Sequence, residues 1–313
     1  MSILVVGAGA TGGYFGGRLA QAGRDVTFLV REGRAAALRE RGLRIVGPGG
    51  TETIKPALAT AVPPGAVADV VLVTVKADGL DAVIPQIRPA VGPRTTIVPV
   101  LNGMRHLSML NGAFGRSSVL GGVALLSTQL DADGDIRQLN DWASLTIGAQ
   151  DRQPTEAVER ARDLLSGAAF PVTVSDDIVA AMWQKWTFIA AAGAVTCLLG
   201  GSVGEIVAVD GGEKMTRAIV EETRSIAAAA GYPVPDGALS QTVGTLTTPG
   251  SPFTSSLYRD LRQGRPVEVE TILGDLVAEG RKAGVHSPLL DAATVALRVH
   301  NASASATSVR ARR

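Results

Sequence analysis

The chain has 313 residues, a formal net charge of +1 and 46% hydrophobic residues. This balance is typical of an ordinary globular protein and excludes the strongly basic surface of a nucleic-acid-binding protein. The length exceeds what one hydrophobic core commonly spans, so we expect two domains. A single cysteine excludes an internal disulfide, and three scattered histidines give no metal-ligand spacing. We therefore expect a protein of the reducing cytoplasm without a bound metal.

Two apolar segments could be mistaken for membrane segments. The N-terminal one has no basic residues ahead of its apolar run and is interrupted by glycines, so it does not predict a signal peptide. The second, residues 186–204, carries no charge and is about as long as a bilayer is thick. It is rich in Ala and Gly and continues from a charged segment. We interpret it as a buried helix at a domain or subunit interface, and we expect no membrane partner.

The first predicted element is a strand at residues 3–6, short and rich in β-branched residues. It leads into a glycine-rich turn, which reads Gly7, Ala8, Gly9, Ala10, Thr11 and Gly12. In dinucleotide-binding domains the first glycine of such a turn allows a tight bend, the second admits the pyrophosphate, and the third allows close helix packing. The N–H groups at the helix start face the phosphates. We therefore predict that this turn binds a dinucleotide.

A second strand, predicted at residues 25–30, ends at Arg31. Domains that bind NAD usually place Asp or Glu about 20 residues beyond the glycines, where it binds the ribose hydroxyls. A guanidinium at that position can instead pair with the 2′-phosphate of NADPH, and Arg34 is close enough in sequence to assist. The alternative is a solvated arginine at a strand end. The glycine-rich turn before it favours an NADPH site.

Strands and helices continue to alternate through residue 101. Buried strands are predicted at 68–75 and 95–101, and they deliver Lys76 and Asn102 at their carboxyl ends. This alternation predicts a doubly wound parallel sheet, in which ligands lie beyond the carboxyl ends of the strands. Residues 118–147 predict an antiparallel extension of that sheet, with a turn at residues 131–135.

A helix at about residues 155–165 and a strand at about 171–174 are expected to close the first domain, and the remainder of the chain is predicted to be helical. The helices are expected at residues 178–199, 212–230, 236–246, 255–263, 268–283 and 288–301. We therefore expect an α/β fold, with a Rossmann-type NADP-binding domain at residues 1–174 and an all-helical substrate and catalytic domain at 175–313.

Lys185 is the first candidate for chemistry, because it interrupts a helix built from Trp, Phe, Ile and Ala. A lysine beside apolar surface loses solvation and has its pKa lowered, which suits a general acid. The alternative is a lysine on the solvent face of the helix. Glu268 and Glu270 lie at a predicted helix start, where acids are stabilised by the helix dipole whatever their function. Ser255 and Ser256 are likewise typical of a helix start.

Several blocks of sequence together resemble the ketopantoate reductase (2-dehydropantoate 2-reductase) family. They occur in the family's order over nearly the whole chain, at residues 7–16, 75–77, 101–104, 183–185 and 255–268. The resemblance implies a Rossmann domain, a helical domain like that of 6-phosphogluconate dehydrogenase, and an active site in the cleft between them. It also implies NADPH-dependent reduction of a 2-oxo acid to a 2-hydroxy acid, with Arg31 selecting the 2′-phosphate.

The resemblance also implies roles for individual side chains. Lys185 matches a lysine that donates a proton to the substrate ketone or polarises it. Glu268 matches an acid that binds the substrate hydroxyl and helps to position the lysine. Lys76 and Asn102 match residues beside the nicotinamide and the substrate, and Ser256 matches a hydroxyl near the substrate carboxylate.

The chain departs from the family pattern at Ile189, Gly193 and Val203, where the family has asparagines. Losing these amides removes hydrogen bonds that a hydroxylated substrate would use. Two substrates therefore stay open: 2-dehydropantoate, reduced to pantoate in pantothenate biosynthesis, or a different 2-oxo acid or carbonyl compound. A non-catalytic NADP(H) sensor is a third reading, which Lys185 and Glu268 together argue against. The uncharged helix after Lys185 leads us to expect a homodimer.

Overall fold

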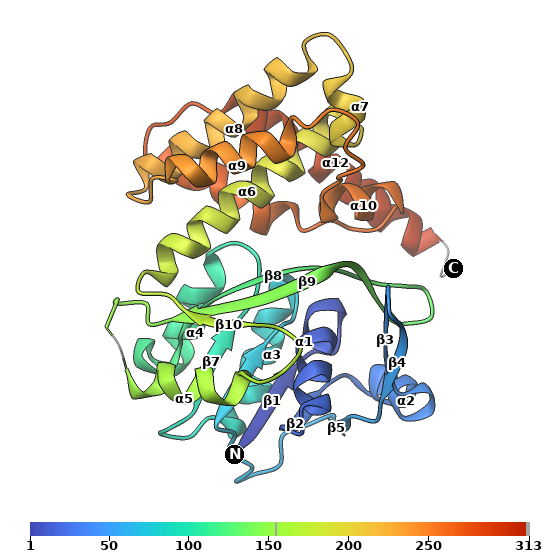
Figure 1. Ribbon diagram of the computed structural model, residues 1–313, viewed down its shortest axis with the longest axis vertical. Helices are drawn as coiled ribbons and strands as arrows, with labels where there is room; N and C mark the ends of the chain where they lie inside the picture. Colours follow the sequence, from blue (N-terminus) through green and yellow to red (C-terminus); the bar gives the residue numbers. More distant parts are fainter. Residues whose placement is uncertain (154, 311–313) are drawn as a thin grey trace. The chain divides into compact units, whose positions relative to one another are not determined.

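The computed structural model describes residues 1–153 and 155–310, with the side chains of 305–310 left out. The chain divides into two compact units. Figure 1 labels the helices and strands of each. Unit 1 comprises residues 1–101 and 106–181, and unit 2 comprises 102–105 and 182–313. The division thus falls after residue 181, inside helix α6 (Ile178–Leu199), whereas the sequence analysis placed the boundary after residue 174. It also assigns the short segment 102–105 to the helical unit.

Unit 1 contains the predicted parallel sheet. Its strands are β1 (Ser2–Val6), β2 (Asp25–Leu29), β5 (Ala57–Ala59), β6 (Val70–Val73) and β7 (Thr96–Pro99), in the order β5-β2-β1-β6-β7. All neighbouring strands of this sheet run parallel. The connecting helices are α1 (Ala10–Gln21), α2 (Glu32–Arg41), η1 (Ala77–Gly79), α3 (Leu80–Ile87) and η2 (Arg88–Ala90). This is the Rossmann-type arrangement that the strand and helix alternation predicted.

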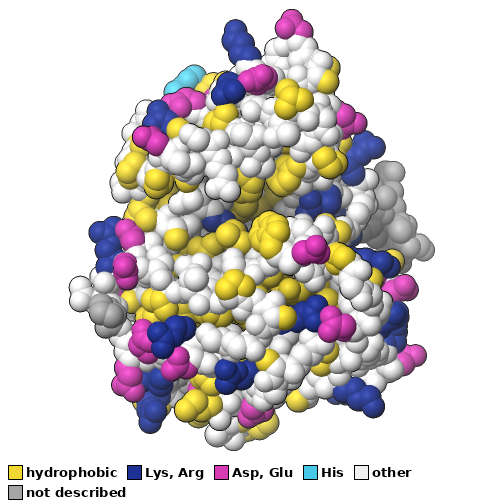
Figure 2. Space-filling view, viewed as in Figure 1, with side chains coloured by type: hydrophobic (Ala, Val, Ile, Leu, Met, Phe, Trp, Pro, Cys, Tyr) yellow, Lys and Arg dark blue, Asp and Glu magenta, His cyan; other side chains and the backbone are white. Residues whose placement is uncertain are grey.

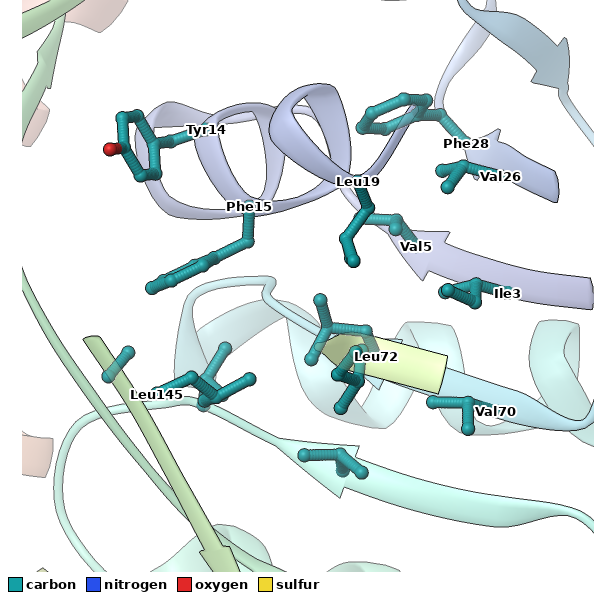
Figure 3. Packing of buried hydrophobic residues seen from close by; sticks show 14 of the residues in the cluster. Ile3, Val5, Tyr14, Phe15, Leu19, Val26, Phe28, Val70, Leu72 and Leu145 are labelled. Atoms are coloured by element: carbon teal, nitrogen blue, oxygen red, sulfur yellow. The ribbon is translucent and has the colours of Figure 1, made fainter. Parts of the chain in front are cut away.

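The core of unit 1 forms where α1 packs on this sheet. Phe15 and Leu19 are fully buried in the same apolar cluster as Val5 and Leu72. In Figure 3 the side chains of Phe15 and Leu19 extend from α1 toward the strands. Residues 3–6 of β1 and all residues of β6 are buried, which explains why both strands are continuous apolar runs in the sequence.

The long hairpin of β8 (Gly121–Leu130) and β9 (Ile136–Gly148) does not extend the first sheet, so that prediction was wrong. It belongs to a second sheet of order β10-β9-β3-β4, in which β8 pairs with β9. The other members are β3 (Leu43–Gly47), β4 (Gly50–Ile54) and β10 (Val172–Val174). The glycines of α1 explain the arrangement, because a Cβ at Gly13 would lie 2.4 Å from Ile136 of β9. Helix α1 is therefore slim enough to contact both sheets.

Three further helical segments, two α-helices and one 3₁₀ turn, complete the connections. Helix α4 (Arg105–Phe114), which the sequence analysis did not predict, follows β7, and the short η3 (Arg116–Ser118) leads into β8. Helix α5 (Glu156–Leu165) was predicted, and the Thr155 hydroxyl caps it by accepting a hydrogen bond from the Val158 N–H at 3.2 Å.

Unit 2 is helical, as predicted. Its further elements are α7 (Val203–Val207), α8 (Gly212–Ala229), α9 (Asp236–Leu246), α10 (Ser256–Arg262), η4 (Glu270–Gly274), α11 (Asp275–Lys282) and α12 (Pro288–Arg310). The sequence analysis missed α7, a short helix whose N-terminus is stabilised by a capping box between Ser202 and Glu205. It also expected one regular helix from residue 268, but η4 is a π-helical turn. Such turns insert a residue into a helix and often occur at functional sites.

Helix α6 is the one helix, in the part of the chain that the structure describes, long and apolar enough to cross a membrane. Most of its apolar stretch is buried inside the protein itself, and Ala190, Ala194 and Val195 are fully buried. The core helix of a soluble protein has the same length and composition. Asp177 directly precedes the helix, and its carboxylate caps the first turn by accepting a hydrogen bond from the Ala180 N–H at 3.1 Å.

Candidate active site

The glycine-rich turn joins β1 to α1 in unit 1. Gly7 has a φ of 97°, a left-handed conformation that favours glycine. The Thr74 hydroxyl, at the end of β6, donates to the carbonyls of Val6 at 2.8 Å and Gly7 at 3.1 Å. A Cβ at Gly12 would lie 2.3 Å from the Gly7 carbonyl oxygen, so only glycine lets the helix approach this closely. The sequence analysis did not assign Thr74 a role at this turn, although a single hydroxyl residue within a run of valines could have indicated one.

The start of α1 suits an anion. Gly9 is its N-cap, and among the described residues no side chain caps it. The first turn carries no acidic residue, and a Cβ at Gly9 would meet no other described heavy atom within 4 Å. The first N–H groups of a helix attract negative charge through the helix dipole. Gly9, Ala10 and Thr11 therefore fit the pyrophosphate of a dinucleotide, as the prediction for this turn requires.

Two predicted cations lie at the carboxyl ends of the strands that flank β1. Arg31 follows β2 as the exposed N-cap of α2, and Lys76 follows β6 as the exposed N-cap of η1. Because parallel strands end at the same edge of a sheet, both residues lie at the edge where the glycine turn lies. Arg34 is engaged elsewhere, since its Nε donates to the Ala8 carbonyl at 3.1 Å and its Nη2 donates to Gly134 at 3.0 Å.

Asn102 follows β7 but groups with unit 2. It is half-buried and precedes Gly103, which has a φ of 72°. A Cβ at Gly103 would lie 2.6 Å from the Thr271 carbonyl oxygen, so the turn packs directly on the π-helical segment. This contact brings Asn102 to the segment that begins just after Glu268.

Lys185 and Glu268 are brought together within unit 2. Burial lowers the pKa of the Lys185 amine to about 8, and the nearby charge of Glu268 opposes that shift. The neighbouring Trp183 and Trp186 are buried, and Trp183 stacks on Tyr232 with ring centroids 5.2 Å apart. The desolvated amine can give up a proton near neutral pH.

Glu268 and Glu270 have different surroundings, although they are close in sequence. The carboxylate of Glu270 forms a two-pronged pair with the guanidinium of Arg298, at 2.7 and 2.6 Å. Glu268, just before the π-helical turn, acts electrostatically on Lys185. Trp186 connects the two elements, because its indole N–H donates to the Ile272 carbonyl at 2.9 Å. The sequence analysis did not assign Trp186 this role.

The paired serines also separate into different environments. Ser255 is the buried N-cap of α10, where its hydroxyl accepts a hydrogen bond from the Tyr258 N–H at 3.0 Å. It also shares a hydrogen bond of 2.7 Å with the Thr196 hydroxyl. Ser256 is exposed at the first helical position. The capping role therefore belongs to Ser255, and Ser256 presents its hydroxyl at the surface of unit 2.

The three positions that depart from the family pattern are apolar in the structure. Residues 185, 189 and 193 are one helical turn apart, so Ile189 and Gly193 continue the Lys185 face of α6. A Cβ at Gly193 would lie 3.3 Å from a methyl group of Leu257. Val203 is fully buried in an apolar cluster.

Cys197 is not a nucleophile in this arrangement. Burial raises the pKa of its thiol to about 12, against hydrogen bonds with Ser255 and Thr196 that lower it. A protonated thiol is a weak nucleophile.

Comparisons with known proteins agree with this architecture. The ketopantoate reductase PanE/ApbA family model matches residues 3–152, and the model for the C-terminal part of the same family matches residues 177–301. An uncharacterized oxidoreductase of Bacillus subtilis, YkpB, is 32% identical over 96% of this chain and 99% of its own length. A 2-dehydropantoate 2-reductase of Caulobacter vibrioides is 28% identical over 92% of this chain and 94% of its own.

Solved structures show the same fold. The 2-dehydropantoate 2-reductase of Geobacter metallireducens superposes with a TM-score of 0.85 at 27% identity, covering 95% of this chain and 99% of that one. D-mandelate dehydrogenase, solved with NADH and anilino(oxo)acetate, has a TM-score of 0.87 at 21% identity, covering 97% and 99%. At that identity the likeness concerns the fold alone. Both family models and the full-length relatives agree: the chain belongs to the ketopantoate reductase family and is an oxidoreductase.

Proposed function

We propose that the protein is a cytoplasmic NADPH-dependent reductase that converts a 2-oxo acid to the corresponding 2-hydroxy acid. The observation that carries this proposal is Lys185, an amine whose pKa is lowered to about 8 by burial and which lies beside Glu268. Family membership implies a nicotinamide cofactor, which supplies the hydride when bound. Unit 1 provides the glycine turn and the helix N-terminus that fit its pyrophosphate.

Lys185 supplies the proton. Addition of hydride to a ketone carbon leaves negative charge on the oxygen, and a cation within hydrogen-bonding reach stabilises that charge. The Lys185 ammonium donates its proton to this oxygen, so hydride and proton together convert the ketone to a hydroxyl group. The charge of Glu268 favours the protonated form of Lys185, so the amine carries its proton at neutral pH. Asn102 and Ser256 are proposed to bind the substrate, with Lys76 beside the cofactor.

The choice of NADPH over NADH rests on Arg31. Its side chain is exposed at the carboxyl end of β2, where an NAD-binding domain usually has an acid. A guanidinium offers paired donors to a phosphate, whereas it has no special advantage for a ribose hydroxyl.

The leading substrate is 2-dehydropantoate, which would place the enzyme in pantothenate biosynthesis. Relatives that carry the name 2-dehydropantoate 2-reductase cover most of this chain at 26–28% identity. A less polar 2-oxo acid is the second candidate, favoured by Ile189, Gly193 and the buried Val203. A pocket without amide partners loses discrimination for a hydroxylated substrate.

A panel of 2-oxo acids assayed with NADPH tests both candidates. We expect turnover of 2-dehydropantoate to exceed that of 2-oxoisovalerate, which lacks the hydroxyl, and that of pyruvate. Equal or slower turnover of 2-dehydropantoate supports the less polar substrate instead. NADPH binding without oxidation by any carbonyl compound would support a sensor and contradict the reductase.

We also propose a soluble homodimer. Charges of both signs are interspersed over the face shown in Figure 2. On α12, Val295 and Val299 lie one turn apart and are 57% and 62% exposed, which gives an apolar strip that a second copy could cover. Light scattering of the purified protein measures the mass, and a monomer at micromolar concentration contradicts the dimer.

A further inference from the structure

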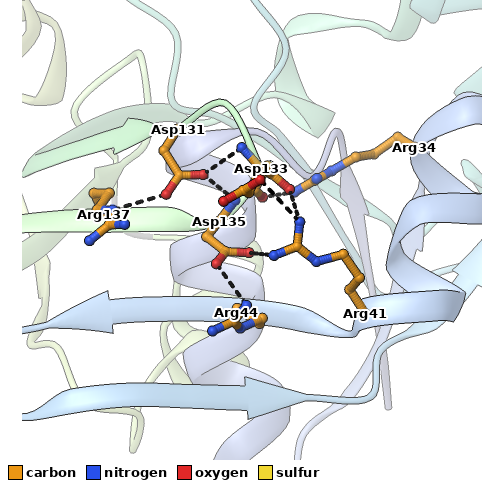
Figure 4. Close-up of polar contacts among 8 residues, drawn as sticks. Arg34, Arg41, Arg44, Asp131, Asp133, Asp135 and Arg137 are labelled. Carbon is orange, nitrogen blue, oxygen red and sulfur yellow. Dashed lines mark hydrogen bonds and ion pairs between the residues drawn. The ribbon is translucent and has the colours of Figure 1, made fainter.

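Arg34 links the glycine turn to a distant hairpin. Its Nε donates to the Ala8 carbonyl at 3.1 Å, and its Nη2 donates to the Gly134 carbonyl at 3.0 Å. Gly134 lies at the tip of the β8–β9 hairpin, which Figure 4 shows beside the arginines of α2 and β3. One side chain from the first turn of α2 therefore bridges the predicted pyrophosphate site and the second sheet.

The bridge sets the orientation of one peptide group. In a trans peptide the N–H points opposite to the C=O, so a carbonyl of Ala8 held by Arg34 directs the Gly9 N–H to the other side. A Cβ added at Gly9 would meet no described heavy atom within 4 Å beyond its two chain neighbours, so this residue is open on the side where a side chain would stand. Thr74 acts in the same way on the preceding peptide, because it holds the Gly7 carbonyl and thereby directs the Ala8 N–H.

The hairpin tip is a firm support for this arginine. Asp131 accepts backbone hydrogen bonds from Asp133 at 3.0 Å and Asp135 at 2.9 Å, so the tip is closed by its own side chain. Asp135 is only 6% exposed and pairs with Arg44 at 3.1 Å and Arg41 at 3.5 Å. These contacts fasten the tip to β3 and α2.

The surroundings of the Arg34 guanidinium are those of a side chain fixed within the protein. Burial lowers the pKa of its guanidinium, and the charge of Asp135 opposes that shift. A Cβ at Gly134 would lie 2.5 Å from the Arg34 Nη1, so glycine at this tip is what lets the guanidinium dock.

We propose that Arg34, supported by the hairpin tip 131–135, is a positioning residue that aims the Gly9 N–H at the cofactor pyrophosphate. The proposal rests on the function proposed above and assigns Arg34 a different task from Arg31. The pyrophosphate is common to NADPH and NADH, whereas the 2′-phosphate occurs only in NADPH. Arg34 therefore supports the binding of both cofactors equally, and Arg31 supports NADPH alone.

Direct binding of NADPH and NADH, followed by the fluorescence of the reduced nicotinamide, tests this assignment. We expect Arg34→Met to raise the Kd of both cofactors by the same factor, about tenfold, because the peptide between Ala8 and Gly9 is no longer held with its N–H toward the pyrophosphate. Turnover at saturating NADPH should stay unchanged while KM rises. Arg34→Lys should recover part of the affinity, because an ammonium can still donate to the Ala8 carbonyl.

A second variant reaches Arg34 without altering it. Gly134→Ala should displace the guanidinium and weaken NADPH and NADH equally, as Arg34→Met does. Arg39→Met is the matched control, since Arg39 lies on the same helix and pairs with the exposed Glu32. It should leave both Kd values unchanged. Melting temperatures of all variants show whether each is folded.

A loss confined to NADPH would make Arg34 a ligand of the 2′-phosphate and overturn the proposal. Unchanged binding of both cofactors by folded Arg34→Met protein would overturn it as well. Wild-type protein that binds neither cofactor would refute the proposed function together with this inference. Wild-type protein that binds both cofactors but reduces no carbonyl compound would refute only the reductase, because the Kd comparison still decides the role of Arg34.

Discussion

Trp186 donates its indole N–H to the carbonyl of Ile272 at 2.9 Å, and this bond joins helix α6 to the π-helical turn after Glu268. The donor lies one residue beyond Lys185. The bond therefore holds the two elements that carry the amine and the carboxylate in one register, within a single unit of the chain. The chemistry proposed for Lys185 depends on that register.

Replacing Trp186 by Phe should loosen this connection. The Ile272 carbonyl would lose its partner, and the smaller ring would leave a void, so we expect the free energy of unfolding to fall by about 2–4 kcal/mol. We also expect kcat to fall, because the Lys185 amine is less well positioned. Urea denaturation and steady-state kinetics measure the two effects. Trp142→Phe is the control, since Trp142 is 56% exposed. A similar loss of stability and kcat in that variant would show that any Trp-to-Phe replacement has this effect, whatever its position.

Activity should depend on pH through Lys185. Because the pKa of this amine is about 8 in the protein without ligands, the protonated amine that donates to substrate is lost as the pH rises through about 8, and kcat/KM should fall there. Glu268 raises this pKa, so Glu268→Gln should move the fall in kcat/KM to lower pH. Rate profiles between pH 6 and 10 test this, and a profile of the Gln variant that moves to higher pH would contradict it.

Removing the amine should abolish activity without unfolding the protein. We expect Lys185→Met to lower kcat by orders of magnitude while the Kd for NADPH hardly changes. The folded protein holds this lysine at a pKa below that of the unfolded chain, so its charge costs stability at neutral pH and the cost fades as the pH rises above about 8. The variant should therefore melt no lower than wild type at pH 7. Lys214→Met, at an exposed lysine, is the control for both measurements.

Cofactor preference should change at Arg31. Arg31→Asp replaces a cation by an anion, so the 2′-phosphate of NADPH would meet a like charge and the preference should shift toward NADH. We expect the ratio of kcat/KM for NADPH over NADH to fall by about a hundredfold, which corresponds to a loss of about 3 kcal/mol. Arg39→Asp makes the same change of charge on α2, the helix that Arg31 caps, and is the control. An unchanged ratio would show that another cation holds the phosphate.

Substrate preference should respond to Ile189. This residue lies one helical turn beyond Lys185, and Ile189→Asn restores an amide where the family has one. We expect kcat/KM for 2-dehydropantoate relative to 2-oxoisovalerate to rise about tenfold, because only the first substrate has a hydroxyl for the amide to bind. A fall in that ratio would show that the apolar face suits the true substrate.

The fold could be predicted largely from local patterns. Strands buried on both faces are continuous apolar runs, and the glycines of the first turn stand where backbone conformation or close approach requires them. The Rossmann arrangement and the helical second half follow from local patterns, and the family resemblance follows from short blocks whose order along the chain can be read without the structure. Lys185 could be singled out because it interrupts an apolar helix, whereas the role of Glu268 was implied by the family resemblance, since an acid at a helix start is stabilised whatever its function.

Other features were decided only by contacts between distant residues. The β8–β9 hairpin belongs to a second sheet, which packs closely on α1 because the glycines of this helix leave room for it. No local pattern specifies which sheet a strand pairs with. The hydrogen bond between Trp186 and Ile272 and the bonds from Arg34 to Ala8 and Gly134 likewise join positions far apart in sequence. Local residue preferences determined which elements form. Packing and hydrogen bonding across the chain determined which side chains meet.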